Sequence, residues 1–172
     1  SSKNRLVALQ SGEIDVLGID AEDFCRTGGV TTAVDTGSAG PGNFAGFRKH
    51  VIEPSQARIL AYLHVSFAGI YGFSKTVMVG ESEDVRLMAP AECAEVADAN
   101  RDLIVGIKVR VGRHSSGDQG TAPLNMALQV AEEVGTRAFA DLDDLLQAVR
   151  AVSVAVPTSF HRDVGLQCLG RG

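Results

Sequence analysis

The sequence lacks several features that would assign a class of protein at once. It has no tryptophan, and its three cysteines, Cys25, Cys93 and Cys168, lie far apart and form no CxxC pair. This spacing argues against a zinc knuckle and a dithiol redox site, and it favours three reduced thiols on helices of a cytoplasmic protein. No apolar stretch approaches the ~20 residues that a membrane span needs.

A run of basic residues is also missing. Lys and Arg total 16 against 21 Asp and Glu, which gives a formal net charge of −5. Nucleic-acid-binding surfaces are basic, so this balance argues against such a partner. Residues 1–17 show no signal-peptide pattern, and the chain does not begin with Met, which is consistent with an N-terminus that was cut. We therefore expect a cytoplasmic protein without a membrane or nucleic-acid partner.

What the sequence does contain suits one α/β domain. The chain has 172 residues, of which 45% are hydrophobic, enough for a core. Short apolar runs alternate with amphipathic segments, which predicts a mainly parallel sheet, either open or an incomplete (β/α) barrel. The predicted strands are 30–35, 57–67, 103–111 and 152–156, and the predicted helices are 43–53, 91–100, 122–134, 141–149 and 159–169. Gly135 is expected to end a helix and Asp141 to cap one.

One stretch, residues 66–89, fits neither pattern. A long loop at the carboxyl end of a strand is a usual place for function in α/β folds, and a plain surface excursion is the alternative. Its acidic residues, Glu81, Glu83 and Asp84, are expected to be solvated.

Four sequence segments in the middle of the chain resemble those of a known protein family. They are GVTTAVDTGSAGPGNF at 29–44, FRKHVIEP at 47–54, VSFAGI at 65–70 and DLIVGIKVRVG at 102–112. Through them, residues 18–135 resemble the deacetylase-type, dihydroorotase-like branch of the amidohydrolase superfamily.

The two ends resemble other families. The run ALQSGEIDV at 8–16 makes residues 1–17 similar to periplasmic amino-acid-binding proteins. The runs FADLDDLL at 139–146 and VSVAVPTSFH at 152–161 make residues 137–172 resemble the nucleotide-binding domain of the glucose–fructose oxidoreductase and inositol dehydrogenase type. We predict a mosaic with segments 1–17, 18–135 and 136–172, forming one compact domain if the chain folds. A recombined gene, an assembly error, an engineered chimera and a generated sequence remain open as its origin.

The amidohydrolase resemblance implies a divalent metal, zinc or manganese, at the carboxyl ends of barrel strands. Such a metal activates water and polarises a carbonyl group. In the family the ligands are a His-x-His pair, a carboxylated Lys, two further His and an Asp, and the Lys position corresponds to Lys108. Its place near the end of an apolar strand supports this, because a lone cation there is costly. The alternative is that Lys108 snorkels or pairs with an acid such as Asp35.

The other ligands of the family are not matched. No His-x-His precedes Gly18, and the segment after Gly135 belongs to another resemblance. The four histidines are better explained otherwise: His50 on a solvated helix face, His64 as a core or rim histidine with satisfied hydrogen bonds, His114 in a loop and His161 in the oxidoreductase-like segment. Catalytic zinc generally has three protein ligands, and a (β/α)₈ barrel needs roughly 250 residues.

The leading hypothesis is therefore an amidohydrolase-derived fragment that is inactive as it stands. If it were active, it would hydrolyse an amide or ester of a small-molecule substrate with metal. One alternative is a noncatalytic chimeric or designed α/β domain. The other is a weak dinucleotide-binding fragment that uses the glycine-rich loop 37–42 and the end of the strand at Pro157, with Thr158 and His161 beside it, although the GxGxxG fingerprint is absent. Open sheet edges also suggest self-association.

Overall fold

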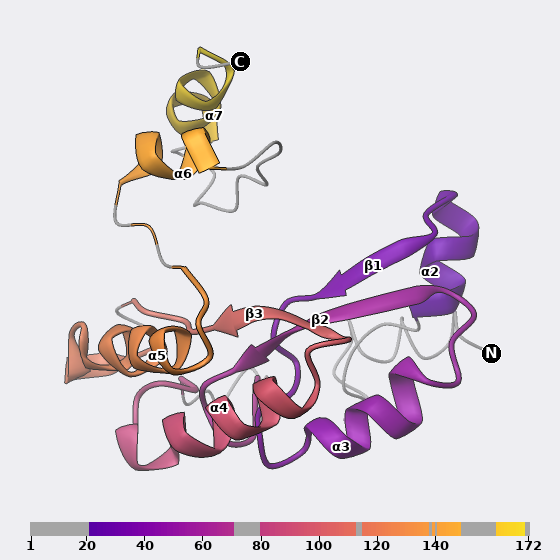
Figure 1. Cartoon of the computed structure of the whole chain (residues 1–172), viewed down its shortest axis with the longest axis horizontal. Helices are drawn as coiled ribbons and strands as arrows, with labels where there is room; N and C mark the ends of the chain where they lie inside the picture. Colours follow the sequence, from indigo (N-terminus) through magenta and orange to yellow (C-terminus); the bar gives the residue numbers. More distant parts are fainter. Residues whose placement is uncertain are drawn as a thin grey trace. The chain divides into compact units, whose positions relative to one another are not determined.

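The computed structural model describes residues 21–70, 80–112, 115–137, 139, 141–148 and 161–170 (Figure 1). The chain divides into two compact units, Ser1–Thr136 and Arg137–Gly172. The predicted segments 1–17, 18–135 and 136–172 stay a prediction, and residues 1–20 lie outside the described part. Across the described residues, no helix is both long and apolar enough to cross a membrane.

The first unit is built on a three-stranded sheet. Its strands are β1 (Thr32–Asp35), β2 (Arg58–His64) and β3 (Ile104–Lys108), in the order β1-β2-β3, and both pairings are parallel. The prediction of an α/β fold with a parallel sheet is thereby confirmed, in the form of an open sheet and not a closed barrel. Each observed strand lies within its predicted range. The predicted strand 152–156 lies outside the described residues.

The pairing of β2 with β3 has one irregularity. Ala61 is opposite Ile104, but Tyr62 is opposite Gly106, so Val105 is an extra residue on β3. Such a bulge changes which residues share a face of the sheet. Beyond it, Leu63 is opposite Ile107 and His64 is opposite Lys108, so the last two residues of both strands are in register.

The helices of the first unit include three at predicted places. The helices of this unit are α2 (Ala21–Gly28), α3 (Phe44–Phe47) with the π-helix η1 (Arg48–Ile52), α4 (Pro90–Ala99) and α5 (Ala122–Glu133), and two short 3₁₀ helices are η2 (Val85–Leu87) and η3 (Gly117–Gln119). Those at predicted places are α3 with η1, α4 and α5. The predicted helix 43–53 is present, but its second half is wider than an α-helix. Gly135 has a φ of 71° directly after α5, as expected of a glycine that ends a helix.

Helix α2 was not predicted. Its sequence nevertheless carried the signals, with Glu22 and Asp23 in the first turn, Arg26 in the last turn and Gly29 just after it. Acidic residues at the start of a helix and a basic residue at its end complement the helix dipole. At eight residues, however, the segment is shorter than the window of about 11–18 residues over which helical periodicity is read.

The core lies on one side of the sheet. Figure 1 shows α3, α4 and α5 together on that side. Ile59, Ala61 and Leu63 of β2 are buried there, and Val130 of α5 belongs to the same cluster. The opposite face is more open: Val34 of β1 remains 45% exposed.

The second unit contains α6 (Leu142–Ala148) and α7 (His161–Leu169). Asp141 caps α6 as predicted, since its Oδ1 accepts the amide N–H groups of Asp143 at 2.8 Å and Asp144 at 3.3 Å.

All three cysteines lie on helices, Cys25 on α2, Cys93 on α4 and Cys168 on α7, and all are free thiols, as expected.

Truncation of Leu63 tests the position of this core. Leu63 is fully buried, so we expect Leu63→Ala to lower the free energy of unfolding by about 3 kcal/mol. Leu128 on α5 is 43% exposed, and Leu128→Ala should cost less than about 1 kcal/mol. Urea denaturation of the two variants measures the difference. Equal losses would contradict the described core.

Candidate functional site

The carboxyl edge of the sheet gathers the polar ends of three strands. Asp35, His64 and Lys108 are the last residues of β1, β2 and β3. Since the strands are parallel, these ends lie along one edge, which is where α/β folds usually bind ligands. The register places His64 and Lys108 directly beside each other. We take this edge as the candidate site.

Asp35 is occupied by the turn that follows it. Its Oδ2 accepts the amide N–H groups of Gly37 at 3.0 Å and Ser38 at 2.8 Å, and its Oδ1 accepts the Ser38 hydroxyl at 2.5 Å. No ion pair links it to Lys108 within the part of the chain that the structure describes. The suggested pairing of Lys108 with Asp35 is therefore wrong, because the carboxylate stabilises its own turn.

The glycine-rich loop after β1 packs against the loop after β2. The Gly40 amide donates to Asn43 Oδ1 at 2.8 Å, and the Gly42 amide donates to the Phe67 carbonyl at 2.9 Å. A Cβ at Gly40 would collide with the carbonyl oxygen of Ser66. These glycines thus allow close backbone packing, and the amides that would bind a phosphate are already bonded to protein oxygens.

His64 is fully buried and has one hydrogen-bonded ring nitrogen. Its Nδ1 accepts the Ser66 amide N–H at 2.9 Å, and its Nε2 is a buried atom without a partner in the described residues. Burial lowers the pKa of His64 to about 4, and the positive charges of Lys108 and Arg110 contribute. The expected core position of His64 agrees with its burial, but the expectation that its hydrogen bonds are satisfied is wrong, because Nε2 has no partner among the described residues. A buried donor without an acceptor costs about 1–3 kcal/mol, so this arrangement calls for an explanation.

The Lys108 stem packs on Gly37. A Cβ at Gly37 would lie 2.6 Å from Lys108 Cγ and 2.9 Å from Lys108 Cβ, and Gly37 has a φ of 100°. Only glycine suits both the backbone angle and the space. Lys108 itself is half-buried, and no carboxylate of the described residues lies within ion-pairing distance of it.

The next charged residue of this segment, Arg110, is paired. Its Nη1 lies 3.1 Å from Oε1 of Glu81, a carboxylate only 3% exposed. The expectation that Glu81 is solvated is therefore wrong, because the loop 80–83 packs on residues 115–116. The contact that fixes it is the Ser82 amide donating to the Ser115 carbonyl at 3.0 Å. Nothing in the acidic run distinguished Glu81 from Glu83, since the distinction arises from a contact distant in sequence.

The remaining histidines do not join the site. His50 is exposed on η1, His114 lies outside the described residues, and His161 begins α7 in the other unit. Among the residues that the structure describes, no three His, Cys, Asp or Glu side chains come together as a metal site would require. Lys108 as a metal ligand remains a prediction.

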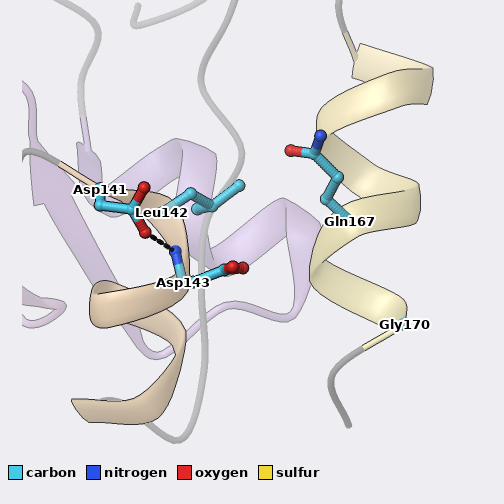
Figure 2. Close-up of a pocket in the computed structure, with 5 residues that line it drawn as sticks. All are labelled: Asp141, Leu142, Asp143, Gln167 and Gly170. Carbon is cyan, nitrogen blue, oxygen red and sulfur yellow. Dashed lines mark hydrogen bonds between the residues drawn. The ribbon is translucent and has the colours of Figure 1, made fainter.

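A second candidate lies within the C-terminal unit. A cavity of about 440 Å³ is lined by Asp141, Leu142, Asp143, Gln167 and Gly170. Figure 2 shows the capping bond from the Asp143 amide to Asp141 at its wall. Its carboxylates make it negative, which opposes binding of the phosphates of a dinucleotide.

Curated proteins named deacetylase are similar to most of this chain. A deacetylase of Brucella anthropi is 35% identical over 144 residues, covering 84% of this chain and 32% of that protein. Deacetylase Atu3266 of Agrobacterium fabrum is 34% identical over 145 residues, covering 84% and 31%. The chain thus spans about a third of the length of the curated relatives it matches.

Two solved structures are similar in fold to about 70% of this chain. A dihydroorotase superposes with a TM-score of 0.58 at 32% identity, covering 71% of this chain and 34% of that one. An adenine deaminase superposes with a TM-score of 0.56 at 26% identity, covering 70% and 33%. The class that the fold and these likenesses define is amidohydrolase-like.

The C-terminal part matches a different family. Residues 122–172 match the oxidoreductase family with an NAD-binding Rossmann fold. The match begins at Ala122, so it includes α5 and starts earlier than the predicted segment 136–172. The chain therefore combines an amidohydrolase-like part with a Rossmann-oxidoreductase-like part, and the predicted mosaic of these two is confirmed. The resemblance of residues 1–17 to solute-binding proteins stays a prediction.

Substitution of Gly37 tests the geometry of the edge. We expect Gly37→Ala to lower the free energy of unfolding by about 1–3 kcal/mol, because its φ is positive and its Cβ would press on Lys108. Gly46, on α3, has open space around it, and Gly46→Ala should be neutral or stabilise by about 0.5–1 kcal/mol. Chemical denaturation of both variants checks this. A Gly37→Ala protein as stable as the parent would disprove the described contact.

Proposed function

We propose that residues 21–136 form one wall of an amidohydrolase-type active site, with Lys108 at the metal-ligand position, and that this chain does not hydrolyse amides or esters by itself. The observation that supports the proposal is the placement of Lys108. It ends the third of three parallel strands at their carboxyl edge, within a part similar to proteins named deacetylase. The substrate class of such a wall is a small molecule with an amide or ester bond.

The residues at the edge do not fit a metal ion in their present arrangement. Neutral His64 uses Nδ1 as an acceptor, so Nε2 bears the proton and has no lone pair for a metal. Asp35 is bonded to its own turn, and an ammonium group at Lys108 repels a cation.

Metal analysis and hydrolysis assays test this proposal. After dialysis against zinc or manganese, we expect less than about a tenth of an equivalent of metal, because the described residues bring no three metal-ligating side chains together. We also expect no hydrolysis of an N-acetyl amino acid or p-nitrophenyl acetate above the buffer rate. The parent protein would instead contain a metal centre if it bound near-stoichiometric metal, if Lys108→Met lost this metal and if Lys49→Met, a change at an exposed lysine, kept it. That result would contradict the proposal.

The second candidate function is weak dinucleotide binding by the C-terminal part. The match of residues 122–172 to the NAD-binding family favours it, whereas the occupied amides of the glycine-rich loop disfavour binding there. If this candidate is right, NADH fluorescence should saturate with a dissociation constant near about 1 mM. His161→Ala should weaken binding, and His50→Ala should not, since His50 is in the other unit. A linear titration without saturation would remove this candidate.

A further inference from the structure

The two ring nitrogens of His64 have different roles. Nδ1 accepts the Ser66 amide N–H, and Nε2 is buried without a hydrogen-bond partner among the described residues. A neutral imidazole carries one N–H, and the nitrogen that accepts a hydrogen bond is the one without it. The proton of neutral His64 is therefore on Nε2. This atom is a buried hydrogen-bond donor that lacks an acceptor.

Lys108 lies beside this donor. It is the register partner of His64 on the neighbouring strand, so both side chains leave the same face of the sheet. A Cβ built on Gly37 would meet the Lys108 stem and would also lie 3.4 Å from Cδ2 of His64, the ring carbon bonded to Nε2. The edge of the imidazole that bears Nε2 and the stem of Lys108 therefore flank the same glycine.

The nearby negative charges are already engaged. Glu81 pairs with Arg110, and Asp35 accepts hydrogen bonds from its own turn. Of the charged groups described around His64, Lys108 is left without a carboxylate partner. A donor N–H beside the strand position of a charged lysine attracts an anionic oxygen, and charge-assisted hydrogen bonds are the strong ones. The same pair of groups repels a cation.

We propose that the carboxyl edge of this sheet binds a small oxyanion. One oxygen accepts the hydrogen bond from Nε2–H of His64, and the charge of Lys108 balances the charge of the anion. Anion binding at this edge goes beyond the proposed hydrolase wall and does not depend on it. An anion accepts the proton on Nε2 of His64 in a hydrogen bond, whereas a metal ion would need a lone pair on that nitrogen. A planar carboxylate and a tetrahedral phosphate share the required chemistry.

Nuclear magnetic resonance of the histidine rings tests the proposal on the full chain. The protein is labelled with ¹⁵N-histidine, kept metal-free with a chelator, and titrated with formate or inorganic phosphate at constant ionic strength, with chloride as reference. We expect His64 to show the Nε2–H tautomer. Its resonances should shift saturably with formate, phosphate or both, but not with chloride. The anion that binds more tightly shows whether the site prefers a planar or a tetrahedral oxyanion. His50 is exposed in the same spectra, and its resonances should not shift.

Variants separate a specific site from a general charge effect. We expect Lys108→Met to weaken the binding at least about tenfold, which corresponds to ~1.4 kcal/mol, and the exposed Lys49→Met to leave it unchanged. His64→Gln keeps an N–H donor and should retain weaker binding. A proton on Nδ1, the absence of saturation with both anions, or equal binding by Lys108→Met would each overturn the proposal. These readouts involve neither metal content nor hydrolysis, so a failure here is distinct from a failure of the proposed function.

Discussion

The first unit depends on β2, which is hydrogen-bonded to a parallel strand on each side. Parallel pairing requires that both neighbours come from crossovers, and here the helices of those crossovers cover one face of the sheet. The alternation along β2 then buries Leu63 on the helix side and brings His64 to the edge on the other. The extra residue Val105 corrects the register of β3, so that Lys108 arrives opposite His64. Core and site are thus consequences of the same pairing.

The hydrogen bonds and ion pairs of its side chains determine the chemistry of the carboxyl edge. The negative charges of Asp35 and Glu81 do not balance the charge of Lys108. Asp35 stabilises its own turn, and Glu81 pairs with Arg110. The Ser66 amide fixes the tautomer of His64. As a result, the described edge contains the buried Nε2 of His64 without a partner and a lysine without a paired carboxylate. Among the residues that the structure describes, no group of three His, Cys, Asp or Glu side chains accompanies Lys108 at this edge.

The division of the chain into two compact units is consistent with the predicted mosaic. The chain is similar in sequence to proteins named deacetylase over 84% of its length and in fold to a dihydroorotase over 71%, and the match to the Rossmann oxidoreductase family extends from Ala122 to the C-terminus. Helix α5 lies in the first unit and also within that family match. An amphipathic helix that covers a parallel sheet is common to both folds, which explains how one helix satisfies both patterns.

The sequence by itself determined the α/β class, the parallel sheet, most helices and the Asp141 cap, because apolar periodicity and end signals are local properties. It also indicated Lys108 as the unusual residue of an apolar strand. Only the tertiary structure decided that His64 is its neighbour, that Asp35 is not its partner and that Glu81 is buried. Those facts depend on register and on loop contacts between residues far apart in the chain, and no local pattern encodes such pairings.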